Sequence, residues 1–160
     1  MTDQHWNSNK KALLFLTSLR ENSREKLTTI SKKTNIPIST LFDMLQEFQS
    51  STITKSTVLL DFSKLGYHTQ AQVFLKVNKE DKDKLKKHLS CHNNVNTIHK
   101  VNNNWDFIIE TVHKNIKELD TFLEHLEQNF QIESKQIHYL VDEVKKEGFV
   151  IEWTLKNIIH

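Results

Sequence analysis

The chain has 160 residues, of which 37% are hydrophobic and 26% charged, and its formal net charge is +2. This composition is that of an ordinary folded protein and excludes a disordered or fibrous chain. No apolar run approaches the ~20 residues that a membrane-spanning helix needs, and the single cysteine, Cys91, excludes an internal disulfide. The first residues lack the apolar segment of a secretory signal, so we expect the chain to stay in the cytoplasm.

Apolar residues at helical spacing predict short helices within residues 1–53, which we expect to form the first domain. The helices are expected at residues 9–20, at residues 24–34 and after "TNIP", a tight turn in which Asn35 can take a left-handed conformation. The expected inward residues are Ala12, Leu13, Leu16, Leu19, Leu27, Ile30, Leu41, Met44, Leu45 and Phe48. Two helices joined by such a turn form a helix-turn-helix, although a plain three-helix packing unit fits the same pattern.

The pattern changes after Ile53. The apolar stretch "TVLLDFSKLGY" predicts a linking strand within a hinge at residues 54–70. Residues 71–147 then alternate in the order βαββαβ, with strands expected at "AQVFLKV", "NVNTIHKV", "WDFIIETV" and "KQIHYLVDEV". This order is ferredoxin-like, an antiparallel sheet with both helices on one face, so the chain is assigned to the α+β class. The bare face of the sheet predicts a homodimer, and residues 148–160 form a tail that can extend an interface.

The third helix is expected to present polar side chains where a DNA-reading helix meets the major groove. Gln46 can pair with adenine, Phe42 can contact a thymine methyl group, and Asp43 can accept a hydrogen bond from cytosine. Ser39 and Thr40 can donate to phosphate near the helix N-terminus. The expected cationic partners of phosphate are Arg24, Lys32, Lys33 and Lys55. A plain solvated helix face explains the same polar residues.

The distribution of charge along the chain fits a DNA partner, and ordinary solvated surface charge explains it as well. Residues 1–55 contain eight Lys/Arg and five Asp/Glu, whereas residues 56–160 contain fourteen and fifteen. A mildly basic first part and a neutral remainder fit double-stranded DNA bound by the first domain. Asp43 and Glu47 on the third helix oppose this interpretation, because each repels phosphate.

Short segments spread over residues 9–147 share one resemblance. They are "LLFLTSLRENSR", "ISKKTNIPIST", "TVLLDFSKLGY", "VNNNWDF" and "LVDEVK". In this order they resemble the opening helix, the turn and recognition-helix start, the linking strand, the effector-domain turn and the closing strand of Lrp/AsnC transcriptional regulators, archaeal members above all. The resemblance implies a helix-turn-helix followed by a ferredoxin-like effector-binding (RAM) domain. It also implies a sequence-specific DNA-binding regulator that acts as a dimer, tetramer or octamer. We expect no cofactor.

The resemblance places Asp106 at the family's acidic position in the effector-domain turn. Asn102, Asn103, Asn104 and Asp106 can together bind a polar, amino-acid-like effector, and the alternative is that the asparagines simply build a turn. Some positions depart from the family pattern. Asp43, Met44 and Glu47 stand where many members carry arginine, Asn103 replaces the usual glycine, and Lys135 and Ile137 replace two frequent threonines.

Histidines suggest two further kinds of chemistry. His88, Cys91 and His92 have a spacing that can place metal ligands on one helix face, but no fourth ligand is spaced nearby and we expect no metal site. His99 and His113, on adjacent predicted strands, suggest a haem-pathway decarboxylase, which looks like an Lrp/AsnC protein that gave up DNA binding. The histidine motifs of such enzymes are not matched, and the simpler interpretation is that His99 and His113 are strand-surface histidines, so we expect no enzyme.

A third alternative is an assembly protein. In that case the second domain forms oligomers, and a degenerate first domain pairs with a partner protein. Such a protein shows no salt-sensitive DNA binding, whereas a regulator loses affinity for DNA steeply as salt rises.

Overall fold

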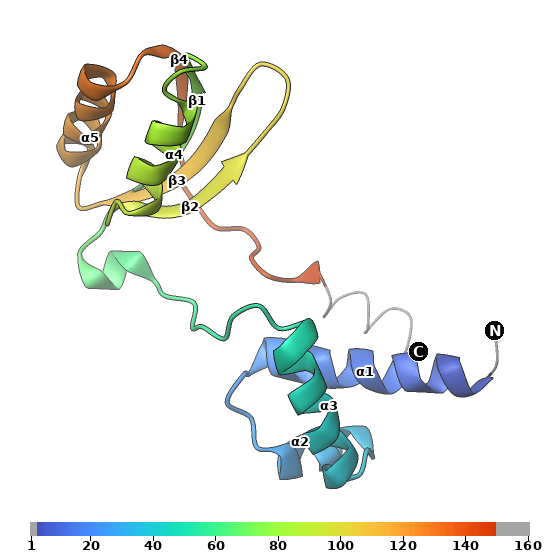
Figure 1. Ribbon diagram of the computed structural model, residues 1–160. Helices are drawn as coiled ribbons and strands as arrows, with labels where there is room; N and C mark the ends of the chain where they lie inside the picture. Colours follow the sequence, from blue (N-terminus) through green and yellow to red (C-terminus); the bar gives the residue numbers. More distant parts are fainter. Residues whose placement is uncertain (1–2, 150–160) are drawn as a thin grey trace. The chain divides into compact units, whose positions relative to one another are not determined.

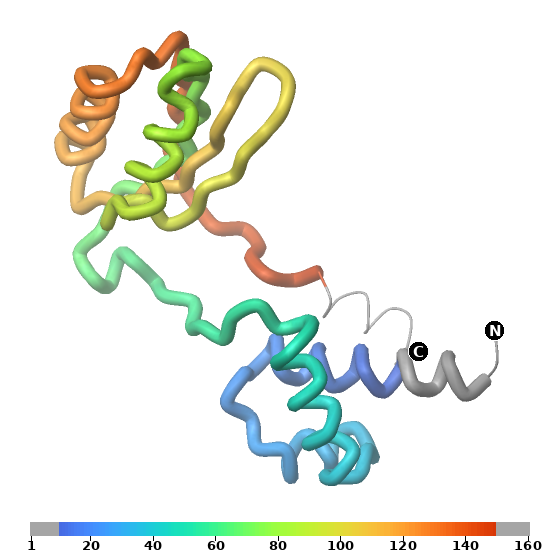
Figure 2. Tube along the Cα trace, in the orientation of Figure 1, coloured from blue at the N-terminus to red at the C-terminus, as the bar shows by residue number. Residues whose placement is uncertain are grey.

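The computed structural model describes residues 3–149, with side chains from residue 10 onward. Contacts divide these residues into two units, one formed by residues 3–59 with 144–149 and the other by residues 60–143. Figure 1 labels the helices and strands of both units, and Figure 2 follows the same chain as a tube. No helix among residues 3–149 is both long and apolar enough to cross a membrane.

The N-terminal unit contains the expected helix-turn-helix. Its helices are α1 (Asp3–Glu21), α2 (Leu27–Thr34) and α3 (Ile38–Ser51). Asn35 ends α2 with φ 56°, so the predicted left-handed turn residue is confirmed. The second helix begins later than expected, because the side chain of Asn22 accepts a hydrogen bond from the backbone N–H of Arg24 at 3.0 Å and holds the preceding residues in a turn.

The core of this unit is centred on an aromatic pair that the spacing did not single out. Phe15 is fully buried, and its ring stacks on that of Phe48 with centroids 6.1 Å apart. The other buried members are Ile30, Ile36 and Leu41, and the partly buried residues packed against them are Ala12, Leu16, Leu19, Leu27, Met44, Leu45 and Ile53. The expected inward faces are therefore confirmed except at Leu13, which is half-buried outside this cluster.

The predicted linking strand is wrong. Residues 53–61 have no regular structure, and Phe62–Leu65 form a short 3-10 helix, η1. The side chain of Asp61 caps η1 by accepting from the Ser63 N–H, and Gly66 ends it with φ 85°. A strand is held by backbone hydrogen bonds to a neighbouring strand. Among the described residues, nothing pairs with 57–60, and Val58, Leu59 and Leu60 are exposed.

The C-terminal unit is the expected ferredoxin-like βαββαβ domain. Its elements are β1 (Thr69–Val77), α4 (Lys82–Ser90), β2 (Val95–Lys100), β3 (Phe107–His113), α5 (Ile116–Asn129) and β4 (Ile132–Tyr139). The strands pair antiparallel in the order β2-β3-β1-β4. Alternate residues of β1, from Ala71 to Val77, are buried against leucines of α4 and α5. Figure 1 shows both helices beside the sheet.

The opposite face of the sheet carries an aromatic group formed by Phe74 of the central strand β1, Trp105 just before β3 and His138 of the edge strand β4. The ring of Phe74 lies 5.8 Å from that of Trp105 and 5.4 Å from that of His138, measured between centroids. The final strand ends at Tyr139, so the expected continuation to residue 144 is wrong. The chain beyond it exposes Val141 and Val144, and the 144–149 segment is joined to α1 by an ion pair between Glu147 and Arg20.

Candidate nucleic-acid interface and effector turn

Helix α3 places the predicted base-reading side chains on its outer surface. The helix starts after Pro37, whose extended backbone (ψ 142°) fits an N-terminal boundary, and it turns Leu41 and Phe48 inward. Phe42 is 51% exposed, and Ser39, Asp43, Gln46 and Glu47 are exposed beside it, while Thr40 is half-buried. A helix with one apolar face and a polar row beginning in its first turn can present that row to the major groove.

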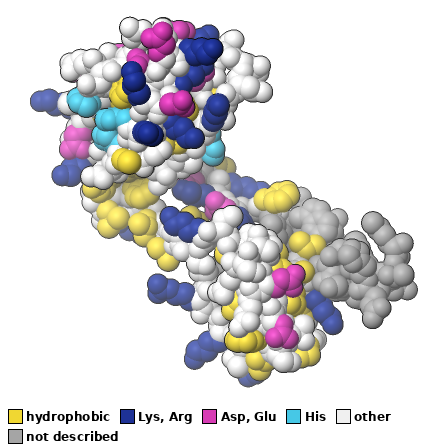
Figure 3. All heavy atoms as spheres, viewed as in Figure 1, with side chains coloured by type: hydrophobic (Ala, Val, Ile, Leu, Met, Phe, Trp, Pro, Cys, Tyr) yellow, Lys and Arg dark blue, Asp and Glu magenta, His cyan; other side chains and the backbone are white. Residues whose placement is uncertain are grey.

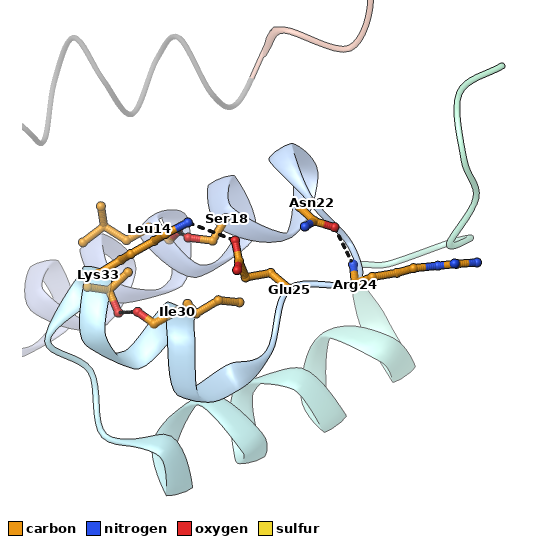
Figure 4. Close-up of polar contacts among 8 residues, drawn as sticks. Leu14, Ser18, Asn22, Arg24, Glu25, Ile30 and Lys33 are labelled. Atoms are coloured by element: carbon orange, nitrogen blue, oxygen red, sulfur yellow. Dashed lines mark hydrogen bonds and ion pairs between the residues drawn. The ribbon is translucent and has the colours of Figure 1, made fainter. Parts of the chain in front are cut away.

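The predicted phosphate partners are all exposed, but one of them is already paired. The ammonium of Lys33 lies 2.9 Å from Glu25 Oε2, so its charge is partly neutralised within the unit. Figure 4 shows this contact and the side chain of Arg24, which extends away from Asn22 and the helices around it. Lys32 and Lys55 are also exposed. Lys26, at the start of α2, is a further exposed cation that the sequence interpretation missed.

The turn between β2 and β3 is held by Asp106 rather than by its asparagines. One carboxylate oxygen of Asp106 accepts from the backbone N–H of Val77 at 3.0 Å, and the other accepts from the ammonium of Lys82 at 2.5 Å. The Asp106 N–H donates to the Leu75 carbonyl at 2.9 Å. Asp106 therefore fastens the turn to β1 and to the start of α4.

The three asparagines of this turn are exposed, and Asn103 adopts a left-handed backbone with φ 69°. This conformation explains why asparagine can stand where the family has glycine, because both residue types tolerate it. The structure brings Asn102, Asn103 and Asn104 together at the tip, with Asp106 behind them facing Val77 and Lys82. Lys82 was missed from the sequence, since it lies 24 residues from its partner.

The electrostatics of Asp106 give a testable pH dependence. Burial by itself raises the pKa of this carboxyl group, but the hydrogen bonds from Lys82 and Val77 and the charge of Lys82 outweigh it, so the pKa lies below 3.8. A depressed carboxyl pKa contributes stability above the unfolded-state value, and that stability is lost as the pH falls through the folded-state pKa.

Replacing Asp106 by asparagine should lower the free energy of unfolding at pH 7 by about 2 kcal/mol, the usual size for a charged hydrogen bond. The difference between the two proteins should shrink as the pH falls below 3.8, where the wild-type carboxylate is also lost. Urea unfolding followed across this pH range measures it. Asp120→Asn, at an exposed position of α5, is the matched control and should change little. Equal effects of both variants would contradict the assignment.

The histidines suggested a metal site and an enzyme, and the structure bears on the two hypotheses differently. His88 and His92 lie side by side, with ring centroids 5.7 Å apart, but Cys91 is exposed, and among the described residues no group of three or more His, Cys, Asp or Glu could hold a metal ion. His99 is exposed on β2. His113 is 1% exposed, so its interpretation as a strand-surface residue is wrong: it points to the helix side of the sheet and contacts the ring of Phe122.

Comparison with known proteins gives the same architecture. An uncharacterised HTH-type transcriptional regulator of Pyrococcus furiosus is 22% identical over 139 residues, which cover 86% of this chain and 93% of that one. The HTH-type transcriptional regulator FL11 of Pyrococcus horikoshii is 25% identical over 107 residues, covering 66% of this chain and 71% of FL11.

Two solved structures show the same fold. Bacillus subtilis LrpC matches with a TM-score of 0.77 and 15% identity, over 84% of this chain and 95% of LrpC. A transcriptional regulator from Neisseria meningitidis in complex with L-Met matches with a TM-score of 0.78 and 14% identity, over 84% of this chain and 90% of that one. The protein-family model described as the Lrp/AsnC ligand binding domain matches residues 70–149 of this chain. The chain therefore belongs to the Lrp/AsnC family.

Proposed function

We propose that this protein is a sequence-specific, double-stranded DNA-binding transcriptional regulator without catalytic activity, acting in the cytoplasm. The observation that carries the proposal is the outer row of α3, in which Ser39, Phe42 and Gln46 are exposed from the first turn onward. Arg24 and Lys32 supply exposed positive charge in the same unit. This combination gives base-edge contacts from α3 and phosphate contacts from its surroundings. The family membership and the names of the Pyrococcus relatives support the same function.

Two surfaces support assembly into a dimer or a higher oligomer. The sheet face opposite the helices carries Phe74 and Trp105, and the connecting segment exposes Val58 and Leu59. A second copy that covers such surfaces would present two α3 helices to two half-sites on one DNA duplex. Joining two weak half-sites raises the overall affinity, which offsets the repulsion of phosphate by Asp43 and Glu47 on α3.

A small polar effector at the turn between β2 and β3 is part of the proposal. Asn102, Asn103 and Asn104 offer amide donors and acceptors at an exposed tip. The amino group of an amino-acid ligand would have to displace Lys82 to reach Asp106, because the lysine ammonium already lies 2.5 Å from that carboxylate. The Neisseria meningitidis structure was solved with L-Met, which supports an amino-acid ligand in this fold. Binding there would couple ligand to DNA affinity through assembly.

Selection of DNA sequences from a random library, followed by titration of the enriched duplex at several salt concentrations, tests the proposal. Gln46→Ala should change the selected sequence and weaken binding to the original one by about 5- to 150-fold, the range for one lost base contact. Gln128→Ala, at an exposed position of α5, is the control and should leave both properties unchanged. If no sequence is enriched and binding does not depend on salt, the protein is an assembly protein and the proposal fails.

A further inference from the structure

Histidines from separate elements gather on the helix side of the C-terminal unit. His88 lies on α4, His92 follows α4, His113 ends β3, and His125 lies on α5. The ring centroid of His88 is 5.7 Å from that of His92 and 5.9 Å from that of His125. Figure 3 shows histidine side chains together on the surface of this unit. These four residues are called the histidine cluster below.

The surroundings of the cluster are aromatic and poor in hydrogen-bond partners. The ring of Phe122 lies 4.6 Å from His92 and 5.5 Å from His113, and that of Phe130 lies 5.3 Å from His88. Within the described part of the chain, the buried Nε2 atoms of His88 and His113 have no hydrogen-bond partner. An imidazolium there would need to donate from both ring nitrogens, which these sites do not satisfy. The packing around His113 therefore favours a neutral ring.

A backbone contact fixes the protonation state of one ring. The N–H of Asn94 donates to Nδ1 of His92 at 3.2 Å, so this nitrogen is an acceptor and carries no proton. Protonation of His92 on Nδ1 would break this bond at the point where the chain leaves α4 for β2. The cluster is thus tied to the local backbone as well as to the packing of α4 against α5.

Most of the nearby charges lower the pKa values of His92 and His113, as burial does, and one carboxylate raises the pKa of His113. Burial lowers the pKa of His92, and the neighbouring His88 and His125 lower it further. Burial also lowers the pKa of His113; Glu118 on α5 raises it, and His92 lowers it again. At His113, burial and the charge of His92 therefore outweigh the Glu118 carboxylate.

We propose that the histidine cluster makes the C-terminal unit sensitive to protons: when His92 and His113 become charged, repulsion and desolvation weaken the packing of α4 against α5, and the unit loosens. The proposal goes beyond the proposed DNA binding, because the cluster lies within residues 60–143 and not in the helix-turn-helix. It would give the protein an acid-sensitive domain whose stability falls below pH 6.5.

The direction and the pH window follow from linkage. A histidine whose folded-state pKa is below its unfolded value of 6.5 leaves stability intact above pH 6.5, and stability is lost as the pH falls from 6.5 to the folded-state pKa. The equilibrium constant for folding then falls by at most about tenfold per pH unit for each such histidine. The carboxyl groups with lowered pKa values, Asp61, Asp81 and Asp106, titrate below 3.8 and stay outside this window.

Titration of the full-length chain by NMR is the first test, because it needs no substitution. Following the ring protons of each histidine from pH 8 to pH 5, we expect His92 and His113 to titrate below 6.5, with line broadening on α4 and α5 as they do. If both titrate at or above 6.5 without broadening, the proposal is overturned. This outcome does not affect the proposed DNA binding, which is measured separately.

Urea unfolding of the full-length chain at pH 7.5 and pH 5.5, followed by signals from the C-terminal unit, is the second test. Between these values we expect the wild-type equilibrium constant for folding to fall, by at most about tenfold per pH unit for each of His92 and His113. His92→Asn should make that fall smaller, because an asparagine oxygen can still accept from Asn94 N–H and does not titrate. His99→Asn, at an exposed position of β2, is the matched control and should leave the fall unchanged. Equal pH dependence in all three proteins would overturn the proposal.

Discussion

Replacing Phe15 by alanine is expected to remove most of the stability of the N-terminal unit. The side chain is 0% exposed and stacks on Phe48 at the centre of the core. Truncation of a fully buried phenylalanine costs about 3–5 kcal/mol, since apolar burial is lost and a cavity remains. A small domain has about 5–15 kcal/mol in total, so a large share of molecules would lose the helix-turn-helix and its DNA binding.

Amide hydrogen exchange measures this effect separately in the two units, which need not unfold together. Protection should fall across α1, α2 and α3 in the Phe15→Ala protein and stay unchanged in β1 and β3 of the C-terminal unit, which serves as an internal reference. Phe42→Ala is the matched control, because the same side chain is 51% exposed on α3. It should leave protection intact and weaken only DNA binding. Similar losses of protection in both variants would show that Phe15 is not the centre of the core.

The contrast between these two phenylalanines shows what the sequence could predict. The helical period places Phe42 outside and Phe48 inside, because α3 has a single clear apolar stripe. Helix α1 carries a run of apolar residues at positions 12–16, and such a run does not say which member is central. Phe15 became the centre because the ring of Phe48 meets it from α3, and that contact is a property of the packing.

The alternation of apolar and polar residues was enough to predict the ferredoxin-like order of strands and helices. The prediction of a linking strand, by contrast, was wrong. Buried residues alternate along β1, where a neighbouring strand lies on each side. The stretch "TVLLDFSKLGY" has the composition of a strand, yet a strand forms only where another backbone pairs with it. Composition reports that the side chains favour a sheet, but it does not report where the partner is. The exposed Val58 and Leu60 are consistent with a partner from a second copy in the proposed dimer.

The candidate site also has one part that the sequence could predict and one part that it could not. Exposure of Ser39, Asp43 and Gln46 follows from helical geometry and could be predicted. The pairing of Lys33 with Glu25 and that of Lys82 with Asp106 join residues 8 and 24 positions apart, respectively, and depend on how loops and helices pack. Sequence interpretation therefore assigned free charge to Lys33 and free ligand-binding capacity to Asp106, whereas both side chains already have partners.

Reversing the negative charges on α3 is expected to raise DNA affinity strongly. Asp43 and Glu47 are exposed one turn apart on the face that is proposed to enter the major groove. Asp43→Lys/Glu47→Lys removes two repulsive charges and adds two cations. Each new phosphate contact steepens the dependence of log K on log[salt] by about 0.9, so the slope should steepen by about 2. Affinity for random-sequence duplex at low salt should rise on the order of 100-fold.

The control must separate a local effect on α3 from the change in net charge. Asp120 and Glu124 have the same residue types at the same spacing, and both are exposed on α5. Asp120→Lys/Glu124→Lys therefore gives the same net charge on a helix that is not proposed to touch DNA. Its salt slope should stay near the wild-type value. If both double variants steepen the slope equally, DNA binds through overall charge, and α3 does not enter the groove. If only the first does, Asp43 and Glu47 weaken non-specific binding, and base contacts such as that of Gln46 must supply the selectivity.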